Sequence, residues 1–178
     1  MRIVNISTTF QDYPDDESQA VIVYFAGCSH GCLGCQNREE QEYNCKGSYN
    51  ITPEDLDTAI ETLCQRNRTN KVVFSGGDPF FEKNRQEVLE LTSYLENKHI
   101  NVCIYTGFPI TEVKNFYEGK LLTHASFFKC GKYRELQKET SWGKTNESLV
   151  LVTRNQAFYN SNFEKISADN ILYFSRMN

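Results

Sequence analysis

Short apolar runs separated by amphipathic segments are the main pattern of the chain. Residues 20–26 (AVIVYFA) form a continuous β-branched and aromatic run, which is typical of a strand buried on both faces. Similar runs at residues 71–75, 101–106 and 125–129 predict three further buried strands. Residues 2–9 instead alternate apolar and polar side chains, which indicates an edge strand or one arm of a hairpin.

Helical patterns lie between these runs. Thr52, followed by Pro53 and two acidic residues, predicts the start of a helix that runs to about residue 66. Apolar residues at helical spacing predict a second helix over residues 84–97, and a short third helix is expected over 111–117. Strands that alternate with helices are typical of βαβ units in a parallel sheet.

The length of 178 residues limits the architecture. A complete eight-fold barrel usually takes ~250 residues. The predicted fold class is therefore α/β, as an open, partial (βα) barrel with a mostly parallel sheet. No repeat, low-complexity tract or linker-like segment divides the chain, so residues 1–178 are interpreted as a single domain. In the C-terminal third, only short strand patterns at 149–153 and 171–174 indicate structure.

Composition and charge exclude several classes of protein. The chain is 39% hydrophobic and 13% aromatic, which is enough for a globular core and argues against disorder. A net charge of −4 without a basic block argues against binding to nucleic acid or to anionic lipid. The first residues lack a signal-peptide pattern, and no apolar run approaches the ~20 residues that span a bilayer. We therefore expect a cytoplasmic protein without nucleic-acid or membrane partners.

The cysteines add candidate chemistry. There are seven, so pairing cannot account for all of them, and in a reducing cytoplasm clustered cysteines more often bind metal or act in catalysis. Three of them lie close together, at Cys28, Cys32 and Cys35. The other four are scattered, at Cys45, Cys64, Cys103 and Cys130. Of these, Cys64 lies in a helical pattern and Cys103 in a strand pattern, and both are expected to be small buried hydrophobes.

The three clustered cysteines allow three interpretations. A structural zinc ion would need a fourth ligand, for which His30 lies in a tight turn and Cys45 is distant. A trio of buried cysteines without a ligand is the second interpretation. The favoured one is a [4Fe–4S] cluster held by three thiolates, with one iron open to another ligand. The glycines at 27, 31 and 34 would let the backbone pass close to the cluster sulfides.

Four loops follow the four predicted buried strands. Besides the cysteine loop, they are residues 75–79 (SGGDP), 105–107 and 129–132. Ligands of parallel sheets gather at the carboxyl ends of the strands, so these loops are expected to meet at one edge. The paired glycines of the second loop either form a simple turn or let the backbone approach a ligand closely.

The Cys-x3-Cys-x2-Cys spacing after the first buried strand resembles the radical S-adenosylmethionine superfamily. The resemblance implies a [4Fe–4S] cluster whose open iron binds S-adenosyl-L-methionine. It also implies one-electron cleavage of that molecule to methionine and a 5′-deoxyadenosyl radical. The Gly-Gly-Asp segment at 76–78 is similar to the superfamily segment that binds the amino group of the methionine moiety.

Longer motifs narrow the resemblance. Residues 27–37, 74–79 and 105–108 resemble the activating proteins of class III (anaerobic) ribonucleotide reductase. This resemblance implies that the adenosyl radical removes hydrogen from a glycine of the reductase, a glycyl-radical enzyme, and that an electron donor such as flavodoxin is needed. The chain departs from the family pattern at Gln36, where many members have an aromatic residue, and at Cys130, where many have Asp.

The site residues implied by the resemblance fall on these motifs. Cys28, Cys32 and Cys35 match the cluster ligands. The residues that match the cofactor-binding set are Gly34, Cys35, Gln36, Ser75, Gly76, Gly77, Asp78 and Thr106. No catalytic residue is expected beyond the cluster and the cofactor, because radical generation needs no acid–base pair.

Other candidates are given simpler interpretations. His30, His99 and His124 are expected to be surface residues. Two alternatives to an activating enzyme stay open. One is a small radical S-adenosylmethionine enzyme that acts on a metabolite such as a deazapurine, and the other is a non-catalytic, zinc-stabilised binding module.

Overall fold

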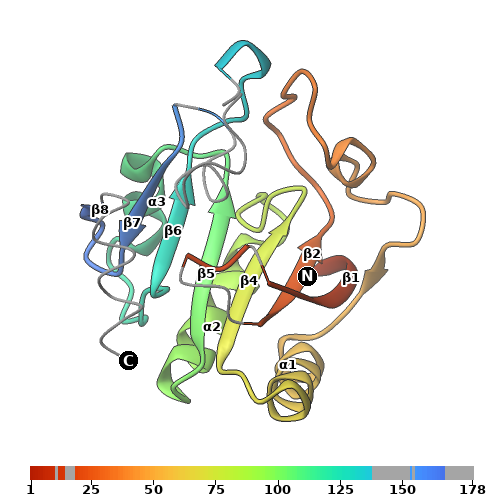
Figure 1. The fold of residues 1–178 in the computed structure, drawn as a ribbon, viewed down its shortest axis with the longest axis vertical. Helices are drawn as coiled ribbons and strands as arrows, with labels where there is room; N and C mark the ends of the chain where they lie inside the picture. The colour runs from red at the N-terminus through yellow and green to blue at the C-terminus, as the bar shows by residue number, and fades with distance from the viewer. Residues whose placement is uncertain (11, 15–18, 138–152, 154, 167–178) are drawn as a thin grey trace.

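One mixed sheet forms the centre of the protein (Figure 1). The computed structural model describes residues 1–10, 12–14, 19–137, 153 and 155–166. The strands are β1 (Arg2–Thr9), β2 (Ala20–Phe25), β3 (Tyr49–Asn50), β4 (Lys71–Gly76), β5 (Asn101–Thr106), β6 (Phe127–Cys130), β7 (Ala157–Asn160) and β8 (Lys165–Ile166). The α-helices are α1 (Pro53–Asn67), α2 (Arg85–Asn97) and α3 (Ile110–Tyr117), and the 3-10 helices are η1 (Arg38–Gln41) and η2 (Glu135–Gln137). None of these helices is long and apolar enough to cross a bilayer.

The middle of the sheet is parallel. Its order within the described residues is β3-β1-β2-β4-β5-β6-β7-β8, and β2, β4, β5 and β6 pair in parallel. The strands on either side are antiparallel. The α/β class and the mostly parallel centre are thus confirmed. The sheet is open, and its curvature into a partial barrel stays a prediction. The strand over residues 2–9 is not the outermost, because Arg2 and Ile3 pair with β3.

The predicted elements agree with the observed ones to within about two residues. Thr52 caps α1 as expected, because its hydroxyl accepts a hydrogen bond from the Asp55 backbone N–H at 3.1 Å. That helix ends where Arg68 adopts a left-handed conformation with φ of 52°. Of the strand pattern at 149–153 only Thr153 is among the described residues, and the pattern at 171–174 lies outside them.

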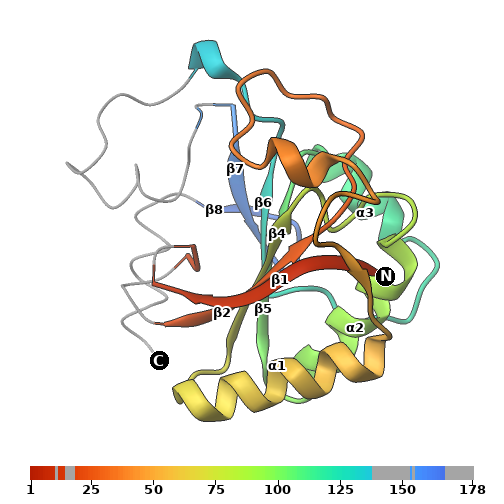
Figure 2. The same cartoon turned by 90° about the vertical axis from the view of Figure 1, so that its right-hand side faces the viewer.

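Apolar side chains fill both faces of the sheet, as the continuous apolar runs predict. Figure 2 shows α2 and α3 on one face, and the larger core lies between this face and the helices. Phe25 and Phe74 pack edge-to-face there, with ring centroids 5.2 Å apart, and Cys64 is buried in the same core. Side chains from the alternate strand positions, including Val73 and Cys103, form a smaller core on the other face. Both cysteines are buried hydrophobes, as expected.

Candidate functional site

A pocket opens at the carboxyl ends of the parallel strands. All four predicted loops contribute to it, so their convergence on one edge is confirmed. The predicted site residues that line it are Cys28, Cys32, Cys35, Gln36, Ser75, Gly76, Gly77 and Thr106. Two others do not line it. Gly34 is exposed and faces the Glu135 side chain. Asp78 is buried beneath the residues that line the pocket.

The three cysteines of the loop after β2 are each half-buried. Gly27, Gly31 and Gly34 all have positive φ, at 99°, 59° and 73°, so each holds a backbone conformation that glycine adopts without steric cost. The Cys28 sulfur accepts a hydrogen bond from the His30 backbone N–H at 3.5 Å. Burial is the main reason that the pKa of the Cys28 thiol rises to about 11. A metal that binds this thiol must therefore displace its proton.

The thiols of the cysteine loop share one pocket. Within the described part of the chain, no three His, Cys, Asp or Glu side chains are positioned to hold one metal ion. The thiols of Cys28, Cys32 and Cys35 nevertheless line one pocket. A [4Fe–4S] cluster distributes its thiolate ligands over separate irons, so the sulfurs need only surround it. Cys45 does not line the pocket and so gives no support to the zinc interpretation.

The loop after β4 is held tightly against the cysteine loop. The Gly77 N–H donates to the Phe25 carbonyl at 2.8 Å, and the Asn37 side-chain amide donates to the Gly76 carbonyl at 2.9 Å. A Cβ on Gly77 would lie 2.5 Å from the Gly27 carbonyl oxygen. The paired glycines therefore allow close approach of protein backbone, in addition to lining the pocket.

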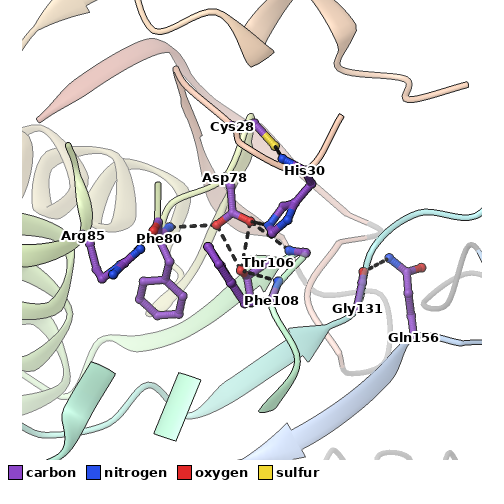
Figure 3. Close-up of polar contacts among 10 residues, drawn as sticks. Cys28, His30, Asp78, Phe80, Arg85, Thr106, Phe108, Gly131 and Gln156 are labelled. Atoms are coloured by element: carbon purple, nitrogen blue, oxygen red, sulfur yellow. Dashed lines mark hydrogen bonds and ion pairs between the residues drawn. The ribbon is translucent and has the colours of Figure 1, made fainter. Parts of the chain in front are cut away.

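Asp78 joins three loops beneath the pocket (Figure 3). Its carboxylate lies 2.7 Å from the His30 ring Nε2 and accepts hydrogen bonds from the Thr106 hydroxyl at 3.0 Å. The backbone N–H groups of Gly107 and Phe80 donate to it at 2.9 and 2.8 Å. Its side chain is only 1% exposed. The residue therefore links the cysteine loop to the ends of β4 and β5, and direct contact with a ligand stays a prediction.

His30 is not a surface residue, so that expectation is wrong. Its side chain is 5% exposed, and its ring packs edge-to-face on Phe108 with centroids 4.5 Å apart. A Cβ on Gly107 would lie 2.2 Å from this ring, so only glycine leaves room for it. The sequence places His30 and Asp78 on neighbouring loops, but only the fold shows that they pair. His99 and His124 do not line the pocket.

Two pocket residues from the later part of the chain, Tyr133 and Gln156, lie outside every predicted loop and motif. Lys129 begins the predicted loop 129–132 and also lines the pocket. The Gln156 amide donates to the Gly131 carbonyl at 3.1 Å, which ties β7 to the loop after β6 (Figure 3). The apolar residues before Lys129 predict a strand that ends at this lysine. The structure buries the residue, which is 5% exposed. The adjacent Cys130 is buried, and burial raises the pKa of its thiol above the ordinary value.

Comparison with known proteins finds relatives that share one name. The chain is 24% identical over 142 residues to the anaerobic ribonucleoside-triphosphate reductase-activating protein of Enterobacteria phage T4, covering 78% of this chain and 87% of that protein. The proteins of the same name from Pasteurella multocida (strain Pm70) and Escherichia coli (strain K12) are 21% and 23% identical. These alignments cover 81% and 72% of this chain, and 97% and 84% of the two relatives.

A family match covers the cysteine loop, the parallel strands and every residue that lines the pocket except Gln156. It is to the 4Fe-4S single cluster domain, over residues 17–150. Since this match includes most of the chain and all three clustered cysteines, the protein belongs to the 4Fe-4S single cluster domain family.

Proposed function

We propose that this protein is an iron–sulfur activating enzyme that reductively cleaves S-adenosyl-L-methionine and generates a glycyl radical on anaerobic ribonucleoside-triphosphate reductase. One observation carries the proposal. Three thiols from a single loop line one pocket, on a chain whose relatives bear the name of that activating protein. The family description of a single 4Fe-4S cluster supports the same reading.

The residues that line the pocket have different proposed roles. Cys28, Cys32 and Cys35 would hold the cluster, and the backbone at Gly76 and Gly77 would face S-adenosylmethionine. When bound and reduced, the cluster supplies the one electron that cleaves S-adenosylmethionine to methionine and a 5′-deoxyadenosyl radical, which takes a hydrogen atom from the partner's glycine. The protein's own part is to hold the loops in register around the pocket.

Three further features belong to the proposal. The electron comes from an external donor such as reduced flavodoxin. The protein acts in the cytoplasm, without a nucleic-acid or membrane partner. The third is that the sheet around β2, β4, β5 and β6 curves as part of a (βα) barrel, with the pocket at its open side reached by the reductase; the parallel pairing of these strands supports it.

The test begins with anaerobic reconstitution with iron and sulfide, followed by a visible spectrum and iron analysis. Wild-type protein should become brown, and Cys32→Ser should lose most of the bound iron. Cys45→Ser is the matched control, because Cys45 is also half-buried but lies outside the pocket. Loaded protein is then incubated with S-adenosylmethionine, a reductant and the anaerobic reductase, and a glycyl doublet should appear in the electron paramagnetic resonance spectrum.

Three other results of these experiments would contradict the proposal. Colourless protein with about one equivalent of zinc would favour a binding module. An unchanged spectrum in Cys32→Ser would show that the thiols do not ligate the cluster. Formation of 5′-deoxyadenosine with a free metabolite, and no doublet with the reductase, would favour a small-molecule enzyme.

A further inference from the structure

The side chain of His30 is held by loops other than its own. The ring is 5% exposed, and its Nε2 lies 2.7 Å from a carboxylate oxygen of Asp78, in the loop after β4 (Figure 3). Phe108, in the loop after β5, packs edge-to-face on the ring with centroids 4.5 Å apart. Gly107 leaves the space that the ring occupies. The ring is therefore fixed by the ends of two parallel strands.

The segment of the cysteine loop around His30 has few other attachments. Within the described residues, the bond of the His30 ring is the only hydrogen bond that joins residues 29–33 to another loop. Gly31, which follows, has φ of 59° and no atom within 4 Å of an added Cβ. Glycine restricts the backbone least, so the segment between Cys28 and Cys32 has little stiffness of its own. The ring is thus the point at which the strand ends hold this segment.

The backbone of His30 contacts one of the three clustered thiols. Its N–H donates a hydrogen bond to the Cys28 sulfur at 3.5 Å. Hydrogen bonds to the sulfurs are among the features that set the reduction potential of an iron–sulfur cluster. The partial positive charge of the donor stabilises the additional electron of the reduced state, so such a bond raises the potential. The N–H keeps its position only while the ring holds residue 30 in place.

We propose that His30 is a positioning residue for the cluster: its ring, anchored on Asp78, holds its backbone N–H against the Cys28 sulfur and makes the cluster easier to reduce. The inference rests on the proposed function, which assigns Cys28 to a [4Fe–4S] cluster that accepts one electron. A carboxylate only accepts hydrogen bonds, so the ring donates to Asp78 through Nε2. His30 therefore acts on the cluster through Cys28.

The first test measures the midpoint potential of the reconstituted cluster by anaerobic redox titration, without S-adenosylmethionine. At a fixed applied potential, His30→Ala should lower the ratio of reduced to oxidised cluster about tenfold, a shift of about 59 mV to more negative values. His30→Gln keeps a side-chain donor for Asp78 and should restore most of the wild-type potential. His124→Gln is the matched control, because the His124 ring also hydrogen-bonds, to the Ser161 carbonyl at 2.8 Å, and lies outside the pocket.

The second test detects the His30 backbone nitrogen directly. Wild-type protein labelled with α-15N-histidine should show a 15N coupling to the reduced cluster in pulsed electron paramagnetic resonance. Loss of this coupling in His30→Gln, which lacks the label at this position, assigns it to residue 30. His30→Ala labelled with α-15N-alanine should show no coupling beyond that of wild type labelled in the same way, although residue 30 still has a backbone N–H.

The outcomes separate this inference from the proposed function. If wild-type protein forms no [4Fe–4S] cluster, both fail. If the cluster forms but the histidine coupling is absent, or His30→Ala keeps the wild-type potential or its own coupling, the role of His30 is refuted while the proposed function stands. An equally low potential in His30→Ala and His30→Gln would also refute it, because the bond to Asp78 would then not position the N–H. If His30→Ala takes up no iron, the histidine coupling of wild type and a near-wild-type potential of His30→Gln are both required, and the absence of either refutes the role.

Discussion

At the residue scale, the pocket depends on buried polar groups whose partners lie far apart in the sequence. Asp78 receives donors from the cysteine loop, from its own loop and from the end of β5. A buried carboxylate is tolerated when its oxygens are fully hydrogen-bonded. Loss of one acceptor would leave a buried donor unsatisfied, which costs more than the bond itself contributes.

Replacement of Asp78 by Asn tests this network. The amide group would place a donor opposite the donors from Thr106, Gly107 or His30, because all of these face the carboxylate oxygens. We expect Asp78→Asn to lower the free energy of unfolding of cluster-free protein by about 2–4 kcal/mol, as measured by urea denaturation. The matched control is Asp55→Asn at the exposed first turn of α1, with an expected cost of about 0.5 kcal/mol. Equal effects of the two substitutions would contradict the network.

At the element scale, backbone hydrogen bonds join the loops after β2 and β4. The Asp78 N–H donates to the Gly27 carbonyl at 2.8 Å, and the Gly27 N–H donates to the Glu40 carbonyl of η1 at 2.8 Å. Gly77 lies between these two carbonyl oxygens, which a Cβ would approach to 2.5 and 2.6 Å. Since backbone atoms cannot move aside as flexible side chains do, the loop has room only for glycine at this position.

Gly77→Ala should therefore separate the two loops. We expect a loss of about 2–3 kcal/mol in the free energy of unfolding, because overpacking forces backbone shifts, together with reduced iron incorporation. Gly119→Ala is the control. Gly119 has φ of +70° but no atom within 4 Å of the added Cβ, so it carries only the backbone strain of about 1 kcal/mol and should leave iron incorporation intact. Normal iron uptake by Gly77→Ala would show that the close approach is not needed for the site.

At the scale of the whole molecule, the pocket couples segments that are distant along the chain. Its lining comes from the cysteine loop, from the ends of β4 and β5, from β6 and from the segment before β7. A ligand that binds only the folded state stabilises all of these segments together.

Addition of S-adenosylmethionine to the loaded protein should reveal this coupling. At about 100 times the dissociation constant, the free energy of unfolding should rise by about 2.7 kcal/mol. Amide hydrogen exchange should slow at residues 75–77 and 105–107, which line the pocket, and should change little in α1, which does not. Cys32→Ser should show neither effect, because it lacks one cluster thiol. Protection that is greatest in α1 would place the ligand elsewhere.

Most of the fold follows from local patterns. The apolar runs predicted β2, β4, β5 and β6, because strands buried on both faces need continuous apolar side chains. Thr52 and Pro53 predicted the start of α1, because capping depends on neighbouring residues. The two-residue strand β3 could not be predicted, since two residues carry no pattern and their pairing with β1 is a tertiary contact.

By itself, the sequence determined the three-cysteine loop, the Gly-Gly-Asp turn and the edge of the sheet where they meet. These follow from spacing and from the direction of parallel strands. Only the tertiary structure decided that His30 and Asp78 form a buried pair, and that Lys129 is a buried cation in the pocket. The physical reason is that burial and hydrogen bonding depend on contacts between distant segments. A polar residue within an apolar run gives no sign of whether it faces solvent, a core or a ligand.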